Sequence, residues 1–307
     1  MERQEVSAPA APSTSAAFDP ADYPNRLNLG CGYDKREGYL NVDFMEFHEP
    51  DLVADVRRLS MLPSDRYVEI IAIDCLEHLP RPETDLSLQE WARLLAPAGV
   101  LRIRTSNVLG LARLLAASTS VDTHRVLIQS LFGTQAYPGD FHVTGFTEIT
   151  LMDHLVRAGL TRIVLQGRDG WLFDAEGSKP DGLIDTALAV SWGRGCYSHE
   201  SDESVSWRWF DSEAEITVVN TSTDDIDVTL RAQVQTGHRR PSRLVVEAGP
   251  ERQTLRVWTA QRALEARFRL EPGPTVIRMS TDAPQVDAPQ DERSLYFRLI
   301  DPSLTTS

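Results

Sequence analysis

Cysteine is scarce in this 307-residue sequence, which has only Cys31, Cys75 and Cys196. Three widely spaced cysteines form neither the paired framework of a disulfide-rich secreted protein nor the close spacing of a zinc site. We therefore expect small buried thiols in a reducing compartment, and we predict a cytoplasmic protein.

Long apolar segments are also missing from the chain. No stretch approaches the ~18 consecutive apolar residues of a membrane-spanning helix, so we predict no membrane span. Residues 1–24 are rich in alanine, proline and serine and lack the apolar segment of a secretion signal. We expect this region to be a disordered leader.

Positive charge is sparse as well. Lysine occurs only at Lys35 and Lys179, and 31 basic residues stand against 45 acidic ones, which gives a formal net charge of −14. Such a chain repels phosphate backbones, and no run of basic residues stands out, so we do not expect nucleic acid as a partner. The hydrophobic fraction of 41% is ordinary for a soluble protein with a buried core.

Short apolar runs alternate with helical patterns in the first two thirds of the chain. Strands are expected at 26–29, 39–43, 52–56, 68–74 and 100–104, helices at 86–95, 107–117, 123–132 and 147–158, and a closing pair of strands at 162–166 and 184–192. This α/β alternation predicts a Rossmann-like, doubly wound, mostly parallel seven-stranded sheet that is covered on both faces.

The pattern changes near Gly193. Beyond it, period-2 alternation replaces helical spacing, as in the run from Leu264 to Leu270, and turn-rich gaps separate the runs. Short alternating strands at this spacing predict an all-β antiparallel sandwich. We therefore expect an α/β domain at 25–193 followed by a β-sandwich at 194–307.

The most informative motif lies where the first expected strand ends. Gly30 and Gly32 follow the apolar run in the spacing Gly-x-Gly, and Asp43 ends the next expected strand. Glycines at a strand end let the backbone approach a ligand closely, and an acid at the end of the second strand can accept both hydroxyls of a ribose. No third glycine follows where a dinucleotide pyrophosphate would need one. We therefore predict a nucleoside cofactor without a pyrophosphate, a description that S-adenosylmethionine fits.

The glycine motif belongs to a set of five that follow one another along residues 25–192. Together they resemble the motifs of class I S-adenosylmethionine-dependent methyltransferases, in particular bacterial predicted methyltransferases of the polysaccharide-synthesis type. The residues that carry the resemblance are 27–32, 38–43, Asp55 with Val56, 74–79 and 94–101.

The resemblance implies where the cofactor would bind. Gly30 and Gly32 would lie beside its amino-acid part, and Asp43 would hold the ribose hydroxyls. The first strand carries Asn28 where many relatives have an acid, so no acidic contact to the cofactor's ammonium group is implied there. The implied cofactor-binding residues are Leu29, Gly30, Cys31, Gly32, Asp43, Asp55, Val56, Asp74 and Cys75.

Methyl transfer to a hydroxyl needs a group that takes the proton. A helix that begins near Cys75 would place Asp74, Glu77 and His78 on one face at the mouth of the cleft. His142 occupies a glycine-flanked loop over the carboxyl ends of the strands, where acceptors bind in such sheets. We take His142, His78 and Asp74 as catalytic candidates, with a purely structural His142 as the alternative.

The same side chains form a possible divalent-metal site. Asp74, Glu77, His78 and His142 resemble the metal ligands of small-RNA terminal 2′-O-methyltransferases and of some ubiquinone-pathway O-methyltransferases. Those sites usually begin with Glu where this chain has the shorter Asp74. We do not favour the metal and predict no metal-binding residues.

The acceptor is expected to bind along the long segment 107–147. Tyr137 and Phe141, near its end, could stack on a ring or pack onto the core. Three tryptophans of the sandwich could stack on sugars, although we favour a place in the sandwich core or in the seam between the domains: Trp207, Trp209 and Trp258.

These observations predict an S-adenosylmethionine-dependent O-methyltransferase that acts on a sugar hydroxyl of a glycan or glycan precursor. One alternative is a non-catalytic glycan-binding or scaffold protein with the same fold. Another is a methyltransferase of a small natural product or a protein carboxylate. The sequence does not indicate an oligomeric state.

Overall fold

The computed structural model describes residues 18–137, 139–180, 188–202 and 204–306. The first part contains β1 (Arg26–Leu29), β2 (Leu40–Asp43), β3 (Leu52–Val53), β4 (Tyr67–Ile73), α1 (Thr84–Leu94), β5 (Leu95–Ser106), α2 (Val108–Ala117), α3 (Val121–Phe132), α4 (Glu148–Arg157), β6 (Thr161–Arg168) and β7 (Leu172–Ser178). The second contains β8 (Leu188–Trp192), β9 (Cys196–Ser201), β10 (Ser206–Phe210), β11 (Glu213–Asn220), β12 (Ile226–Thr236), β13 (Ser242–Ala248), β14 (Glu251–Val257), β15 (Arg262–Leu270), β16 (Gly273–Thr281) and β17 (Phe297–Thr306).

The first seven strands lie side by side in the order β3-β2-β1-β4-β5-β7-β6. Strands β1 to β5 run parallel, with Leu27 of β1 between Leu40 of β2 and Ile70 of β4. Strand β7 is antiparallel to both of its neighbours, β5 and β6. The mostly parallel α/β sheet predicted from the sequence is therefore present.

The edge of this sheet differs from the prediction. The expected closing strands 162–166 and 184–192 do pair, as β6 and β8, but β6 also forms an antiparallel hairpin with β7, and the strand at Leu172–Ser178 was not predicted. The expected strand at 184–192 is described only as β8, and its residues 184–187 lie outside the described part of the chain. Strand β8 runs parallel to β6 and pairs on its other side with β11. Because both edges of β8 are hydrogen-bonded, one twelve-stranded sheet crosses the expected boundary at residue 193.

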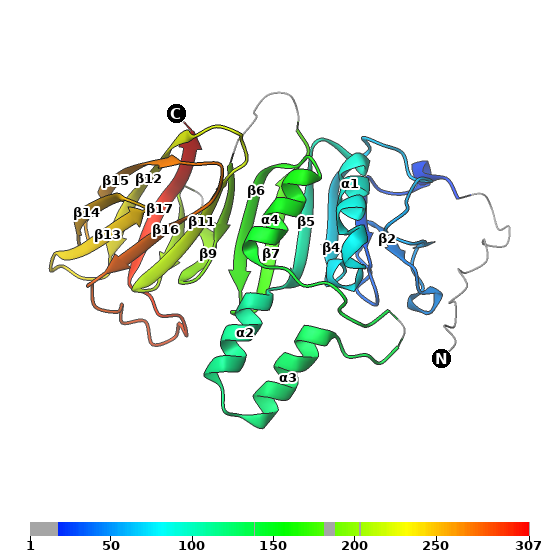
Figure 1. Cartoon of the computed structure of the whole chain (residues 1–307), viewed down its shortest axis with the longest axis horizontal. Helices are drawn as coiled ribbons and strands as arrows, with labels where there is room; N and C mark the ends of the chain where they lie inside the picture. The colour runs from blue at the N-terminus through cyan, green and yellow to red at the C-terminus, as the bar shows by residue number, and fades with distance from the viewer. Residues whose placement is uncertain (1–17, 138, 181–187, 203, 307) are drawn as a thin grey trace.

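Helices α1 and α4 pack on the same face of the sheet (Figure 1). Asn107 caps α2 by accepting a hydrogen bond from the Gly110 amide at 2.9 Å, and Thr147 forms a capping box on α4. Helices α2 and α3 form an arm that projects from the sheet (Figure 1). These helices occupy the positions that the spacing predicts.

The other face of the parallel sheet carries ion pairs, so the prediction that helices cover both faces was wrong. Glu69 lies 3.7 Å from Arg26 and 2.9 Å from Arg102, and Arg102 lies 2.7 Å from Glu176. These side chains come from adjacent strands and are partly exposed. The reason lies in the connections, because the described segments β1–β2 and β2–β3 contain no α-helix that could cover this face.

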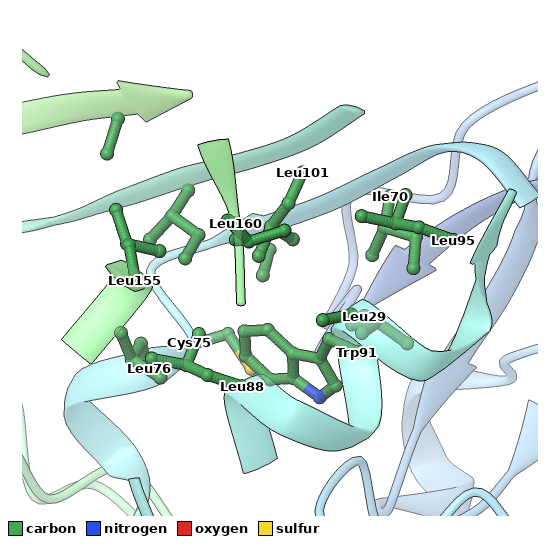
Figure 2. Packing of buried hydrophobic residues seen from close by; sticks show 14 of the residues in the cluster. Leu29, Ile70, Cys75, Leu76, Leu88, Trp91, Leu95, Leu101, Leu155 and Leu160 are labelled. Carbon is green, nitrogen blue, oxygen red and sulfur yellow. The ribbon is translucent and has the colours of Figure 1, made fainter. Parts of the chain in front are cut away.

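The core of the first part lies between the sheet and helices α1 and α4 (Figure 2). Trp91 of α1 is fully buried there, and its indole N–H donates to the Val56 carbonyl oxygen at 2.8 Å. Residues 18–24, which we expected to be part of a disordered leader, also contact this core. Phe18 and Tyr23 pack against it, and Arg66 donates to the Tyr23 carbonyl at 3.0 Å. Residues 1–17 lie outside the described part of the chain.

A second sheet, in the order β15-β12-β17-β10-β9, shares a hydrophobic core with the C-terminal half of the twelve-stranded sheet. Phe210 and Phe297 stack in this core with ring centroids 4.9 Å apart. Trp207, Trp209 and Trp258 are not among its buried residues, so the interpretation that placed them in the sandwich core was wrong. The alternation of β10 turns Arg208 and Phe210 inward instead.

The three cysteines are buried and unpaired, as predicted. None of the described helices has the length and apolar character needed to cross a bilayer.

Candidate functional site

A cavity of about 640 Å³ opens at the carboxyl ends of the parallel strands. This size is ordinary for a small-molecule site, and the position is where doubly wound sheets bind ligands. The cavity brings together most residues that the sequence singled out: Gly30, Gly32, Asp43, Asp55, Val56, Asp74, Cys75, His78 and His142. Leu29 and Cys31 do not line it, because their side chains are buried beside the glycine loop.

The two glycines of the loop after β1 are needed for different reasons. Both have positive φ, +62° at Gly30 and +48° at Gly32. A Cβ on Gly30 would lie 2.5 Å from the Cys75 sulfur, whereas the space beside Gly32 is open. The Gly32 amide donates to the Asp43 Oδ2 at 2.8 Å. The loop is thereby tied to the end of β2 and closes one wall of the cavity.

Asp43, at the end of β2, is buried and lines this wall of the cavity. Its Oδ1 accepts the Met45 amide at 2.8 Å and its Oδ2 accepts the Gly32 amide. His48 Nδ1 lies 3.1 Å from the same Oδ1, but the geometry is not that of a hydrogen bond. Each carboxylate oxygen has a further lone pair, so Asp43 can still accept hydrogen bonds from a ligand.

Asp55 lies in the cavity wall with its carboxylate already engaged. Arg57 donates to both oxygens, with Nη2 2.6 Å from Oδ2, and its Nη1 lies 2.5 Å from Glu83. Burial acts to raise the pKa of Asp55, but the hydrogen bonds from Arg57 outweigh it and the pKa is lowered. The Asp55 carboxylate is therefore less available to hydrogen-bond an adenine than the Val56 backbone beside it.

Asp74 is the most unusual residue of the cavity. It has a positive φ of +49°, which is rare for a residue with a side chain. Asp74 is exposed to solvent and its carboxylate makes no hydrogen bond to any other residue in the described ranges, although partial desolvation at the cavity wall raises its pKa. A solvent-exposed carboxylate without a protein partner, on a backbone with positive φ at a cavity wall, is a functional candidate.

The expected helix after Cys75 is a single 3-10 turn at Leu76–His78. Pro80 explains this difference, since the residue before a proline is held out of the helical region, as Leu79 is at φ −85° and ψ 140°. Glu77 is consequently 1% exposed and accepts a hydrogen bond from the Thr105 hydroxyl at 2.9 Å. The predicted helical face of Asp74, Glu77 and His78 therefore does not form, although all three residues line the cavity.

His78 and His142 come together although 64 residues separate them in the sequence. Their rings meet edge to face with centroids 4.8 Å apart. His78 Nδ1 lies 3.2 Å from the Phe141 carbonyl oxygen, and His142 Nδ1 lies 3.0 Å from that of Ser130. A carbonyl only accepts, so each Nδ1 carries a proton in the neutral ring and each Nε2 is an unprotonated acceptor. Burial, and then the neighbouring His78, lower the pKa of His142.

The loop that carries His142 is fastened to the turn after β4. The amides of Val143 and Thr144 donate to the Glu77 carbonyl at 2.9 and 3.1 Å, and the Thr144 hydroxyl donates to the Leu79 carbonyl at 2.6 Å. Phe141 contributes its carbonyl oxygen to the contact with His78, and the residue is 44% exposed and does not line the cavity. This fastening is what places His142 in the cavity.

Several lining residues were not predicted. Phe44 and His48 follow β2, Ser106 ends β5, Trp171 lies in the turn between β6 and β7, and Leu172 begins β7. The turn could not be found because the β6–β7 hairpin itself was missed. Phe44, His48 and Ser106 carried a usable signal, since they stand at or just after strand ends.

The described residues contain no group of three His, Cys, Asp or Glu side chains arranged to hold a metal ion. We therefore derive no metal-dependent step.

Replacing Glu77 by Gln is expected to stabilise the protein at alkaline pH. Burial raises the pKa of Glu77 from 4.5 to about 7, so the folded state penalises the charged form while the unfolded chain ionises it freely. The penalty is absent below pH 4.5 and complete above pH 7. Glu77→Gln should therefore gain up to about 3 kcal/mol at pH 8 and little at pH 4.5 in urea unfolding. The exposed Glu37→Gln serves as the control, and equal stabilities of Glu77→Gln and the parent at pH 8 would contradict this.

The comparisons with known proteins give structural neighbours only. No protein-family model and no curated sequence matches the chain. A possible exported protein from Bordetella parapertussis is similar at a TM-score of 0.40 and 13% identity, over 52% of this chain and 63% of that one. A SAM-dependent methyltransferase from Archaeoglobus fulgidus gives 0.38 and 12%, over 51% and 86%. A putative S-adenosylmethionine-dependent methyltransferase from Listeria monocytogenes gives 0.34 and 12%, over 50% and 90%. Likeness at this level carries no functional argument, so function rests on the site.

Proposed function

We propose that this chain is an S-adenosylmethionine-dependent methyltransferase that transfers a methyl group to a hydroxyl. The observation that carries the proposal is one cavity that joins the Gly30–Gly32 loop and Asp43 to the free Nε2 of His142. A nucleoside-binding wall and a proton acceptor are the two elements that such a reaction needs.

The cofactor half of the cavity fits a nucleoside without a pyrophosphate. The open space beside Gly32 admits a ligand close to the backbone, and Asp43 keeps lone pairs for two ribose hydroxyls. The Val56 backbone borders the place for the base. When bound, S-adenosylmethionine would supply an electrophilic methyl group, which leaves the protein the tasks of orienting the acceptor and removing its proton.

The acceptor half contains the proton acceptor. His142 Nε2 would take the hydroxyl proton as the acceptor oxygen gains the methyl group, and the Ser130 carbonyl keeps the ring in the tautomer required. The carboxylate of Asp74, which is exposed in the cavity lining, can accept a hydrogen bond from a second hydroxyl of the acceptor. His78, edge to face with His142, holds the base in place.

The charges of the cavity favour an uncharged polyhydroxylated acceptor, such as a sugar in a glycan or glycan precursor. Asp43, Asp74 and Asp140 line the described cavity. Arg57, the guanidinium in this lining, is committed to Asp55 and Glu83. A phosphorylated or carboxylated acceptor would therefore be repelled by these carboxylates, and the Arg57 guanidinium would not be free to pair with it.

Trp171 and Tyr137 favour a second candidate acceptor, a small aromatic natural product. Both residues line the cavity and supply apolar ring surface. This alternative keeps the same cofactor site and differs only in the acceptor.

The experiment that tests the proposal is a calorimetric titration of the protein with S-adenosylhomocysteine. We expect saturable binding of one ligand per chain. Folded protein that binds none would reject the enzyme and favour a non-catalytic glycan-binding or scaffold protein. With binding established, methyl transfer from labelled S-adenosylmethionine to neutral sugars, to their phosphate esters and to phenols distinguishes the acceptors.

A further inference from the structure

Two tryptophans lie on the outer face of the five-stranded sheet, opposite the core. Trp207 and Trp209 alternate along β10 with the buried Arg208 and Phe210, so both indoles point away from the sandwich interior. Both are partly exposed. Large aromatic side chains on a solvent face forgo the benefit of full burial, so a pair of them is a candidate binding surface.

Arg298 of the neighbouring strand β17 lies against both indoles. It pairs with Trp209 across the ladder, and its Cζ lies 5.7 Å from the Trp207 ring centroid and 5.4 Å from that of Trp209. Gln235 accepts hydrogen bonds from Arg298 Nε and Nη2 at 3.2 and 2.9 Å. These two hydrogen bonds hold the guanidinium in one orientation, and they do not use the N–H groups of Nη1.

Arg298 has no carboxylate within ion-pair distance in the part of the chain that the structure describes, although the whole chain has a net charge of −14. The nearby cation Arg293 shows the contrast, since it lies 2.6 Å from Glu200 and 2.7 Å from Asp291. Glu200 also accepts the indole N–H of Trp207 at 3.2 Å. Arg293 is thus paired with carboxylates, whereas Arg298 is a cation that lies over both tryptophans without a carboxylate partner in the described residues.

We propose that this surface, which we call the tryptophan patch (Trp207, Trp209, Arg298 and Gln235), binds an acidic saccharide. A sugar ring presents an apolar C–H face that matches indole, and a uronate carboxylate complements the guanidinium of Arg298. A nucleic acid presents a phosphate at every nucleotide, which one guanidinium on a strongly acidic chain does not balance. The patch is a second site, distinct from the cavity, and it does not depend on the proposed methyl transfer.

The test is to measure the binding of a tetragalacturonate to the full-length protein by tryptophan fluorescence and by calorimetry. Maltotetraose serves as the neutral counterpart. We expect saturable binding of the tetragalacturonate and weaker binding of maltotetraose. Trp207→Ala with Trp209→Ala should weaken tetragalacturonate binding by about tenfold or more, and Arg298→Gln should remove the preference for the acidic sugar.

Trp258→Ala is the matched control, because Trp258 also lies under an arginine, with the Arg262 Cζ 5.0 Å from its ring centroid. It should bind as the parent does, and so should Asp43→Ala, whose defect is confined to the cavity. The proposal is overturned if the parent binds no tetragalacturonate, binds both tetrasaccharides equally, or binds unchanged after the double substitution in a folded variant. Loss of S-adenosylhomocysteine binding alone would reject the proposed function and leave the patch standing.

Discussion

Replacing Asp43 by Ala should abolish measurable binding of S-adenosylhomocysteine. In the proposed cofactor site the buried carboxylate would accept two ribose hydroxyls, and hydrogen bonds to a charged group contribute about 1.5–3 kcal/mol each. Their loss corresponds to a decrease in affinity of about 100-fold or more. Calorimetric titration of the parent and the variant measures it directly.

The same substitution also removes a structural contact, so the experiment needs a control. Asp43 accepts the amides of Gly32 and Met45, and the Ala variant leaves both without that partner. Asp43→Asn keeps the size of the side chain and one acceptor, and circular dichroism verifies that each variant is folded. Asp34→Ala, at a side chain 67% exposed and paired with Arg36, should bind as the parent does. A folded Asp43→Ala variant with parental affinity would show that the nucleoside binds elsewhere.

Replacing His142 by Gln should decrease kcat by about 10²- to 10⁴-fold, the usual contribution of a general base. Binding of S-adenosylhomocysteine should be unchanged, because His142 belongs to the proposed acceptor half of the cavity, on the loop fastened to Glu77 and Leu79. His124→Gln is the control, since that histidine also bonds a backbone carbonyl through its ring but lies outside the cavity lining. An unchanged kcat in His142→Gln would leave His142 with a structural role only.

The pH profile adds a readout that a structural role would not move. A base must be unprotonated, and burial together with His78 lowers the pKa of His142 below its ordinary value of 6.5. The rate of the parent should therefore rise with pH, with a midpoint below 6.5, and stay level above neutrality. The His142→Gln variant should lose this acidic limb.

The contrast between α4 and the turn after β4 shows how far local pattern reaches. Thr147 and Gly159 set both ends of α4 in the sequence, and the helix lies between them. After Cys75, helical spacing suggested a shared face for Asp74 and Glu77, but Pro80 limits the segment to one 3-10 turn. Spacing predicts a shared face only where the chain can continue the helix.

The extent of the sheet was another property that local pattern did not contain. The sequence pattern of β8 predicted a strand, but it did not predict which strands would pair with β8 on its two sides. Pairing with β11 extends one sheet through residue 193, because an edge strand offers its free N–H and C=O groups to any strand that comes alongside. The sequence pattern changes at the expected domain boundary near residue 193, but the sheet continues across it.

The sequence alone determined the parallel sheet and the place of the cavity, because glycines after β1 and an acid at the end of β2 act through their immediate neighbours in the chain. Only the tertiary structure decided the rest of the site. His142 meets His78 across 64 residues through hydrogen bonds from backbone groups that every sequence shares. The side of β10 that holds Trp207 and Trp209 depends on which sheet packs against the other. The types of residues that are close in the sequence determine the local structure. Long-range contacts depend on packing and on backbone hydrogen bonds, which the residue types do not specify.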